Sequence, residues 1–236
     1  MSVRSLWARQ ITNELKSCSC PGCTRNRAGI SPYCATHKQA KSDRGDPLSR
    51  LPSRNELAIF KRAIALYLGT DPKMAAKVTT DLSALERRMT LPPSFCLSPG
   101  DIHGKLPVVA KTTGLRANWQ HRHGRTYTEA VIHALALMGW MSVYYDTGTS
   151  GGLWRNRKAF LDTRAGAVFG DISKPSAKMA KVVSGAVKRH LGSHLTRHAA
   201  TVYGRDFWSS PVATASGQSM TILDYAKLAL RAANLL

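Results

Sequence analysis

The sequence predicts a mainly helical α+β fold with one small β-sheet and a compact cysteine-containing module at the N-terminus. Three observations lead to this prediction. Apolar residues recur at helical spacing in several segments, a few short apolar runs lie between glycine-rich turns, and four of the five cysteines fall between positions 18 and 34. With 236 residues, 43% of them hydrophobic, the chain can bury a substantial core. We divide it into residues 1–54, 55–93 and 94–236.

Residues 1–54 hold the cysteine cluster and then a polar stretch, KSDRGDPLSRLPSR, at 41–54. Two prolines and four basic residues in that stretch are typical of a linker or of an arm that contacts phosphates.

Residues 55–93 are predicted to form a helical hairpin. Leu57, Phe60 and Ile64 recur at helical spacing up to Leu68, and Gly69 ends this first helix. Thr70 or Asp71 can cap the second helix, Pro72 suits its first turn, and an apolar stripe follows it to Met89. Two helices joined so closely form either a helix-turn-helix or a plain αα-hairpin.

Residues 94–236 are predicted to be a basic α+β domain that binds nucleic acid. We expect an irregular segment over 94–124, and then a helix through Met138 whose Thr126 and Glu129 have capping-box spacing. A strand over 141–145 would turn at TGTSGG and pair with 165–172. A helix starting at Pro175 and a last helix over 220–235 complete the fold.

The charge balance indicates a polyanionic partner. Lys and Arg number 34 against 14 Asp and Glu, a formal net charge of +20. Contacts between cations and phosphates release condensed counterions, so nucleic acid is the expected partner, DNA in preference to RNA. A membrane surface is not expected, because no basic amphipathic anchor flanked by Trp and Phe is present.

The N-terminal residues contain too few consecutive apolar residues for a secretory signal, and no segment approaches the length of a membrane span. Clustered cysteines beside a histidine indicate metal binding rather than disulfides in such a chain. We therefore expect a cytoplasmic protein, associated with the nucleoid or in the cytoplasm of a host.

The cysteine motif is CSCPGCTRNRAGISPYCATH. A tetrahedral zinc site takes two close pairs of ligands from short turns. Cys34 and His37 form one pair, whereas the other is Cys23 with either Cys18 or Cys20. The spacing alone leaves that choice open, and Pro21 with Gly22 supplies a tight turn in both cases.

The string of Cys18, PGC at 21–23 and YCATH at 33–37 resembles a short zinc knuckle of phage and mobile-element proteins that often precedes an HNH-type nuclease domain. The resemblance implies Cys18, Cys23, Cys34 and His37 as ligands of one Zn²⁺. The remaining sequence has no HNH core, so nuclease activity does not follow. The knuckle either contacts DNA through Arg25, Arg27 and Lys38 or only folds the N-terminus.

Three further stretches combine cations with aromatic residues or helical spacing, which suits contacts with phosphates, guanine edges and unpaired bases. We predict nucleic-acid contacts from Arg116, Trp119, Arg122 and Arg125; from Trp154, Arg155, Arg157 and Lys158; and from Lys174, Lys178, Lys181, Lys188 and Arg189. In addition, His190, His194 and His198 recur every four residues, which permits a second metal site or three histidines facing phosphates.

TGLR at 113–116, HLTRHAAT at 194–201 and MTILDYAKLA at 220–229 resemble, in order, the catalytic strings of phage-type tyrosine recombinases. This resemblance implies Tyr225 as nucleophile, with Arg116, Arg197 and His194 around the phosphate. The spacing between Arg116 and His194 is compressed, and the expected Gly-His pair before the tyrosine is replaced by Ser216 and Gly217.

The prediction from sequence is a non-catalytic, zinc-containing nucleic-acid-binding protein of phage or mobile-element type. The alternatives are a divergent tyrosine recombinase and a phage-type factor that binds host machinery on nucleic acid.

Overall fold

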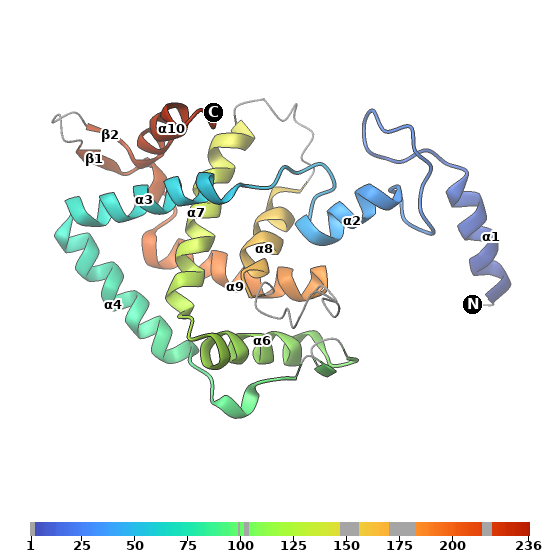
Figure 1. Cartoon of the computed structure of the whole chain (residues 1–236), viewed down its shortest axis with the longest axis horizontal. Coiled ribbons are helices and arrows are strands. Elements are labelled where there is room, and N and C mark those ends of the chain that lie inside the picture. The colour runs from blue at the N-terminus through green and yellow to red at the C-terminus, as the bar shows by residue number, and fades with distance from the viewer. Residues whose placement is uncertain (1–2, 99, 102–103, 147–155, 170–182, 214–218) are drawn as a thin grey trace.

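A computed structural model describes residues 3–98, 100–101, 104–146, 156–169, 183–213 and 219–236. It is mainly helical with one two-stranded sheet, as the sequence predicts (Figure 1). The elements in chain order are α1 (Val3–Glu14), α2 (Ala35–Arg44), α3 (Arg54–Thr70), α4 (Pro72–Met89), η1 (Pro93–Phe95), α6 (Val108–His123), α7 (Tyr127–Asp146), α8 (Arg157–Ala167), α9 (Gly185–Tyr203), η2 (Phe207–Ser209), β1 (Pro211–Ala213), β2 (Ser219–Thr221) and α10 (Ile222–Ala232). Along the described residues no helix combines the length and apolar content needed to cross a membrane.

Helix α7 is the central element. It packs against α3 and α4 on one side and against α8 and α9 on the other (Figure 1). Its apolar side chains are buried around most of its circumference, as expected for a helix surrounded by other helices: Ala130, Val131, Ala134, Leu135, Ala136, Leu137, Trp140 and Val143. One cluster of buried hydrophobic residues runs from α3 to α10, and a second, separate cluster contains Cys18, Cys20 and Cys34.

The helical hairpin is confirmed. The Asp71 carboxylate accepts a hydrogen bond from the Met74 amide at 3.0 Å, and Pro72 lies in the first turn of α4, as predicted. The Thr126 hydroxyl accepts from the Glu129 amide at 3.2 Å, which confirms the predicted start of α7.

Two predictions about residues 94–236 are wrong. The segment expected to be irregular over 94–124 contains α6, which ends at Gly124 with φ of 57°. The strand expected over 141–145 is the C-terminal part of α7, because that apolar run continues the buried surface of the helix. Its expected partner over 165–172 begins inside α8, and residues 170–172 lie outside the described residues, as does the helix start expected at Pro175.

The small sheet is formed elsewhere. Strands β1 and β2 pair antiparallel, with Pro211 opposite Thr221 and Val212 opposite Met220. Strand β2 leads directly into α10, where the Thr221 hydroxyl accepts from the Asp224 amide at 3.0 Å. The sheet therefore shapes the entry to the last helix.

The polar stretch 41–54 is not a free linker. Gly45, at φ of 80°, lies against α8, where an added Cβ would be 2.1 Å from the Ala159 carbonyl oxygen. The buried Asp46 carboxylate accepts from the Leu48 amide at 2.9 Å and from the Asn156 amide at 2.8 Å. This stretch therefore ties the N-terminal module to the body of the protein.

Candidate metal centre and cationic residues

The first turn of the knuckle is built by Pro21 and Gly22. The Cys23 amide donates to the Cys20 carbonyl at 3.1 Å, and Gly22 has φ of 71°. Proline in the second position and a glycine with positive φ in the third are typical of a type II turn. The turn places Cys23 beside Cys18, whose own amide donates to the Arg25 carbonyl at 2.8 Å.

The second ligand pair comes from the start of α2. Cys34 is the residue that precedes the helix, and His37 lies in its first turn. The N-terminus of α2 therefore positions both members of this pair.

The four predicted residues meet at one point. The potential ligand atoms of Cys18, Cys23, Cys34 and His37 all lie within 4.8 Å of one another. The His37 Nδ1 is 3.3 Å from the Cys18 sulfur and 3.4 Å from the Cys34 sulfur, and the sulfurs of Cys23 and Cys34 are 3.9 Å apart. This group can hold a metal ion.

The same geometry resolves the choice between Cys18 and Cys20. Cys20 is buried, but its sulfur is not part of the group, and its carbonyl closes the turn. Burial raises the pKa of the Cys18 thiol, but backbone hydrogen bonds from Cys20 and Cys34 and the contact with His37 lower it to about 6. The Cys34 amide lies 3.3 Å from the Cys18 sulfur. Cys18 is thus held in an environment that favours a thiolate.

Of the knuckle cations, Arg27 is engaged internally. Its guanidinium donates to the Ser17 carbonyl at 2.9 Å and to the side chains of Asn13 and Ser19, each at 3.1 Å. Arg25 donates to the Thr36 hydroxyl at 2.7 Å, and Lys38 is exposed. Arg27 therefore holds the knuckle together.

The first predicted nucleic-acid cluster divides into structural and exposed residues. Trp119 is buried, and its indole N–H donates to the Thr126 carbonyl at 3.2 Å, so it offers no face for a base. Arg116 donates to the Met89 carbonyl at 2.8 Å, and its guanidinium lies 5.5 Å from the centre of the Tyr127 ring. Arg122 and Arg125 are exposed at the C-terminal end of α6.

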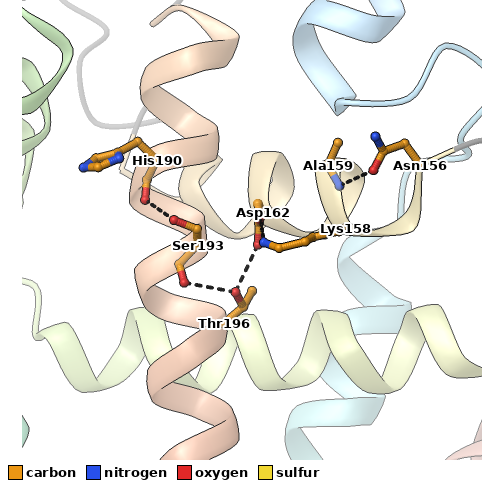
Figure 2. A network of polar contacts seen from close by, with 7 residues as sticks. All are labelled: Asn156, Lys158, Ala159, Asp162, His190, Ser193 and Thr196. Carbon is orange, nitrogen blue, oxygen red and sulfur yellow. Dashed lines mark hydrogen bonds and ion pairs between the residues drawn. The ribbon is translucent and has the colours of Figure 1, made fainter.

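In the second cluster, the exposed Lys158 forms an ion pair with a buried carboxylate, as Figure 2 shows. Its ammonium group lies 2.5 Å from the buried Asp162 carboxylate, which also accepts from the Thr196 hydroxyl of α9 at 3.0 Å. Arg157 is exposed beside it, whereas Trp154 and Arg155 lie outside the described residues.

In the third cluster, Lys188 is buried. Its backbone packs against α8, since its carbonyl oxygen lies 1.8 Å from the place of an added Cβ on Gly166. Arg189 is exposed. Lys174, Lys178 and Lys181 lie outside the described residues.

Helices α4, α6 and α9 together form one cationic feature that the sequence did not predict. Burial lowers the pKa of His194 and of His198, and nearby positive charges lower both further. For His198 those charges include His194, Arg88, Arg197 and Arg116. The spacing of the histidines predicts that they share one face of a helix, but nothing in the sequence indicates that Arg88 lies near that face.

Comparison with protein-family models, with curated proteins and with solved structures gave no match to this chain.

Proposed function

We propose that this chain is a zinc-containing nucleic-acid-binding protein of the phage or mobile-element type, with DNA as the preferred ligand and without catalytic activity of its own. The observation that carries the proposal is the excess of cations. Even if every one of the 14 carboxylates is paired with one cation, 20 of the 34 Lys and Arg residues are left without an acidic partner. Polyphosphate ligands relieve such an excess.

The identity of the metal is inferred from donor chemistry. Three sulfurs and one imidazole are the ligands of a structural zinc site. With Zn–S distances of about 2.3 Å and Zn–N distances of about 2.0 Å, tetrahedral geometry separates two sulfurs by about 3.8 Å and sulfur from nitrogen by about 3.5 Å. The observed 3.9 Å between Cys23 and Cys34 and 3.3–3.4 Å to His37 fit these values.

A non-catalytic role is supported by the position of Tyr225. This residue packs against the hydrophobic core from α10, which contacts α3, η2 and α7. Arg116 and His194 lie on α6 and α9, and α6 is at the opposite end of the molecule from α10 (Figure 1). A recombinase nucleophile must stand beside those groups.

The metal is tested by elemental analysis of protein purified without added zinc. We expect about one equivalent of zinc per chain, and we expect Cys34→Ser and His37→Ala to lose it, because a site with three ligands binds far more weakly. Cys20→Ser is the matched control and should keep the full equivalent. Loss of zinc in Cys20→Ser together with retention in Cys18→Ser would overturn the ligand assignment.

Nucleic-acid binding is tested with random-sequence duplex DNA and duplex RNA of equal length over a salt series. We expect the logarithm of the affinity to fall linearly with the logarithm of salt concentration, with tighter binding to DNA. Arg122→Gln should reduce the slope by about one unit if this exposed side chain contacts a phosphate. An affinity that hardly changes with salt would contradict direct phosphate contact and favour a protein partner. A covalent protein–DNA adduct on nicked substrates that Tyr225→Phe abolishes would contradict the non-catalytic role.

A further inference from the structure

A cavity of about 380 Å³ lies between α4 and α9. Its polar lining comes from Lys77, Asp81 and Arg88 of α4 and from His198 and Thr201 of α9. Neither the metal centre nor most of the predicted nucleic-acid contacts involve these residues.

The carboxylate in this lining is already neutralised. Asp81 forms an ion pair with Lys77 at 2.7 Å, one turn earlier on the same helix. Glu86, the other carboxylate on this half of α4, points to α7 and accepts from the amides of Tyr127 at 2.9 Å and Thr128 at 2.7 Å. Arg88 makes no hydrogen bond or ion pair within the described part of the chain and is exposed. The unbalanced charge of the cavity is therefore positive.

His198 offers a hydrogen-bond donor to the cavity. Its Nδ1 lies 3.2 Å from the hydroxyl of Tyr127, a buried residue that does not line the cavity. Burial raises the pKa of Tyr127 to about 12 and lowers that of His198, so the tyrosine stays protonated and the imidazole is neutral. The hydroxyl then donates to Nδ1, which leaves the hydrogen of the neutral ring on Nε2.

Arginines near His198 add positive potential, and two further histidines lie close to it on α9. His190, His194 and His198 follow one another at intervals of four residues on α9, and the rings of the first two are 4.9 Å apart. Arg197 and Arg116 act electrostatically on His198 in addition to Arg88. Such a group of cations and N–H donors around a cavity attracts an oxyanion and binds it through charge-assisted hydrogen bonds.

From this geometry we infer that the α4–α9 cavity binds a phosphate group, with the Arg88 guanidinium and His198 Nε2 as its main donors. The source of the phosphate is either a free phosphate or a phosphodiester of nucleic acid. The second source rests on the proposed function, whereas affinity for phosphate itself does not.

The test measures binding of inorganic phosphate, and separately of a short duplex DNA, to the full chain at fixed moderate salt. Arg88→Ala should weaken phosphate binding by about 10-fold or more, as expected for loss of a charged hydrogen-bonding partner. His198→Gln, which removes the ring but keeps a polar side chain, should weaken it by at least about 3-fold. Arg87→Ala is the matched control, because this exposed neighbour carries the same charge and does not line the cavity. It should change phosphate affinity less than 2-fold.

Equal effects of Arg88→Ala and Arg87→Ala would overturn the site, because binding would then depend on general charge only. Absence of phosphate binding by the wild type, with DNA bound normally, would also overturn it and leave the proposed function intact. Phosphate binding that depends on Arg88 without any DNA binding would support the site and overturn the proposed function. Thermal unfolding followed by circular dichroism checks that each variant is folded.

Discussion

Gly166 of α8 and Gly192 of α9 face each other where the two helices cross. We therefore expect Gly192→Ala to destabilise the protein strongly. A Cβ on Gly192 would lie 1.6 Å from the Asp162 carbonyl oxygen and 2.7 Å from the Gly166 amide nitrogen. These are backbone atoms of α8 and cannot rotate away. The helices are also joined at this point by the hydrogen bond between Thr196 and Asp162 (Figure 2).

The size of the effect follows from the displacement required. Ordinary van der Waals contact of a Cβ begins at 3.4 Å, whereas the added Cβ would lie 1.6 Å from the Asp162 carbonyl oxygen. The two helices must therefore separate by about 1.8 Å. Adding a methyl group to a packed core costs about 1–3 kcal/mol, and rigid neighbours place this case at the upper end or beyond. A loss of about 3 kcal/mol corresponds to a decrease in Tm of about 6–12 °C for a chain of this size.

The assay is urea unfolding followed by circular dichroism, with Gly69→Ala as the matched control. Gly69 lies in α3 with nothing within 4 Å of an added Cβ. The same substitution should therefore be neutral or stabilise by up to about 1 kcal/mol, because alanine is the better helix former. If Gly192→Ala unfolds at the same urea concentration as the wild type, the close crossing of α8 and α9 is refuted.

Two further predictions concern carboxylates that accept hydrogen bonds from backbone amides. Glu86→Ala should destabilise the protein by about 1–3 kcal/mol in the same urea assay, because it leaves the first amides of α7 without their acceptor. Glu129→Ala is the control, because it removes an exposed carboxylate that lies 3.8 Å from Arg125. It should change the free energy of unfolding by less than about 0.5 kcal/mol. For Glu56, burial raises the pKa, but the hydrogen bond from the Ser53 amide and the other polar contacts outweigh this and hold it below 4.5. The folded-state pKa is thus depressed, so the charge stabilises the protein above about pH 4.5 and this contribution is lost as pH falls through the folded-state pKa. Glu56→Gln should therefore lose stability at pH 7, and its difference from the wild type should narrow below pH 4.5; a constant difference at both pH values would contradict this reasoning.

The parts of the fold that the sequence predicted correctly are those specified by nearby residues. The hairpin of α3 and α4 is one example, since Asp71 and Pro72 act within a single turn of α4. The group that could hold a metal ion is another, because Cys18, Cys23, Cys34 and His37 fall within 20 residues and their chemistry limits the possible partners. Spacing alone did not decide between Cys18 and Cys20 as the partner of Cys23. The turn that uses the Cys20 carbonyl could only be seen in three dimensions.

The prediction of a strand over 141–145 was wrong for a different reason. Short apolar runs fit a buried strand and a buried helix equally well. Helix α7 is surrounded by α3, α4, α8 and α9, so it has no polar face to reveal a helical period. Its burial on several sides is a property of the whole fold and is absent from the local sequence.

The cations show most clearly what a sequence cannot specify. The excess of positive charge predicts a class of partner, but it does not say which side chains are available to that partner. Arg116 and Lys158 stand in basic stretches, yet one donates to the Met89 carbonyl and the other pairs with Asp162. Arg88 stands in an ordinary amphipathic helix and becomes notable only because α9, more than 100 residues later, brings His198 to the same cavity. Availability is decided by the partners that the fold assigns to each cation. Substitutions that test the proposed nucleic-acid binding should therefore be chosen first from exposed cations that have no hydrogen-bonding or ion-pair partner among the described residues, such as Arg88 and Arg122. Cations in the most basic stretches of sequence come second.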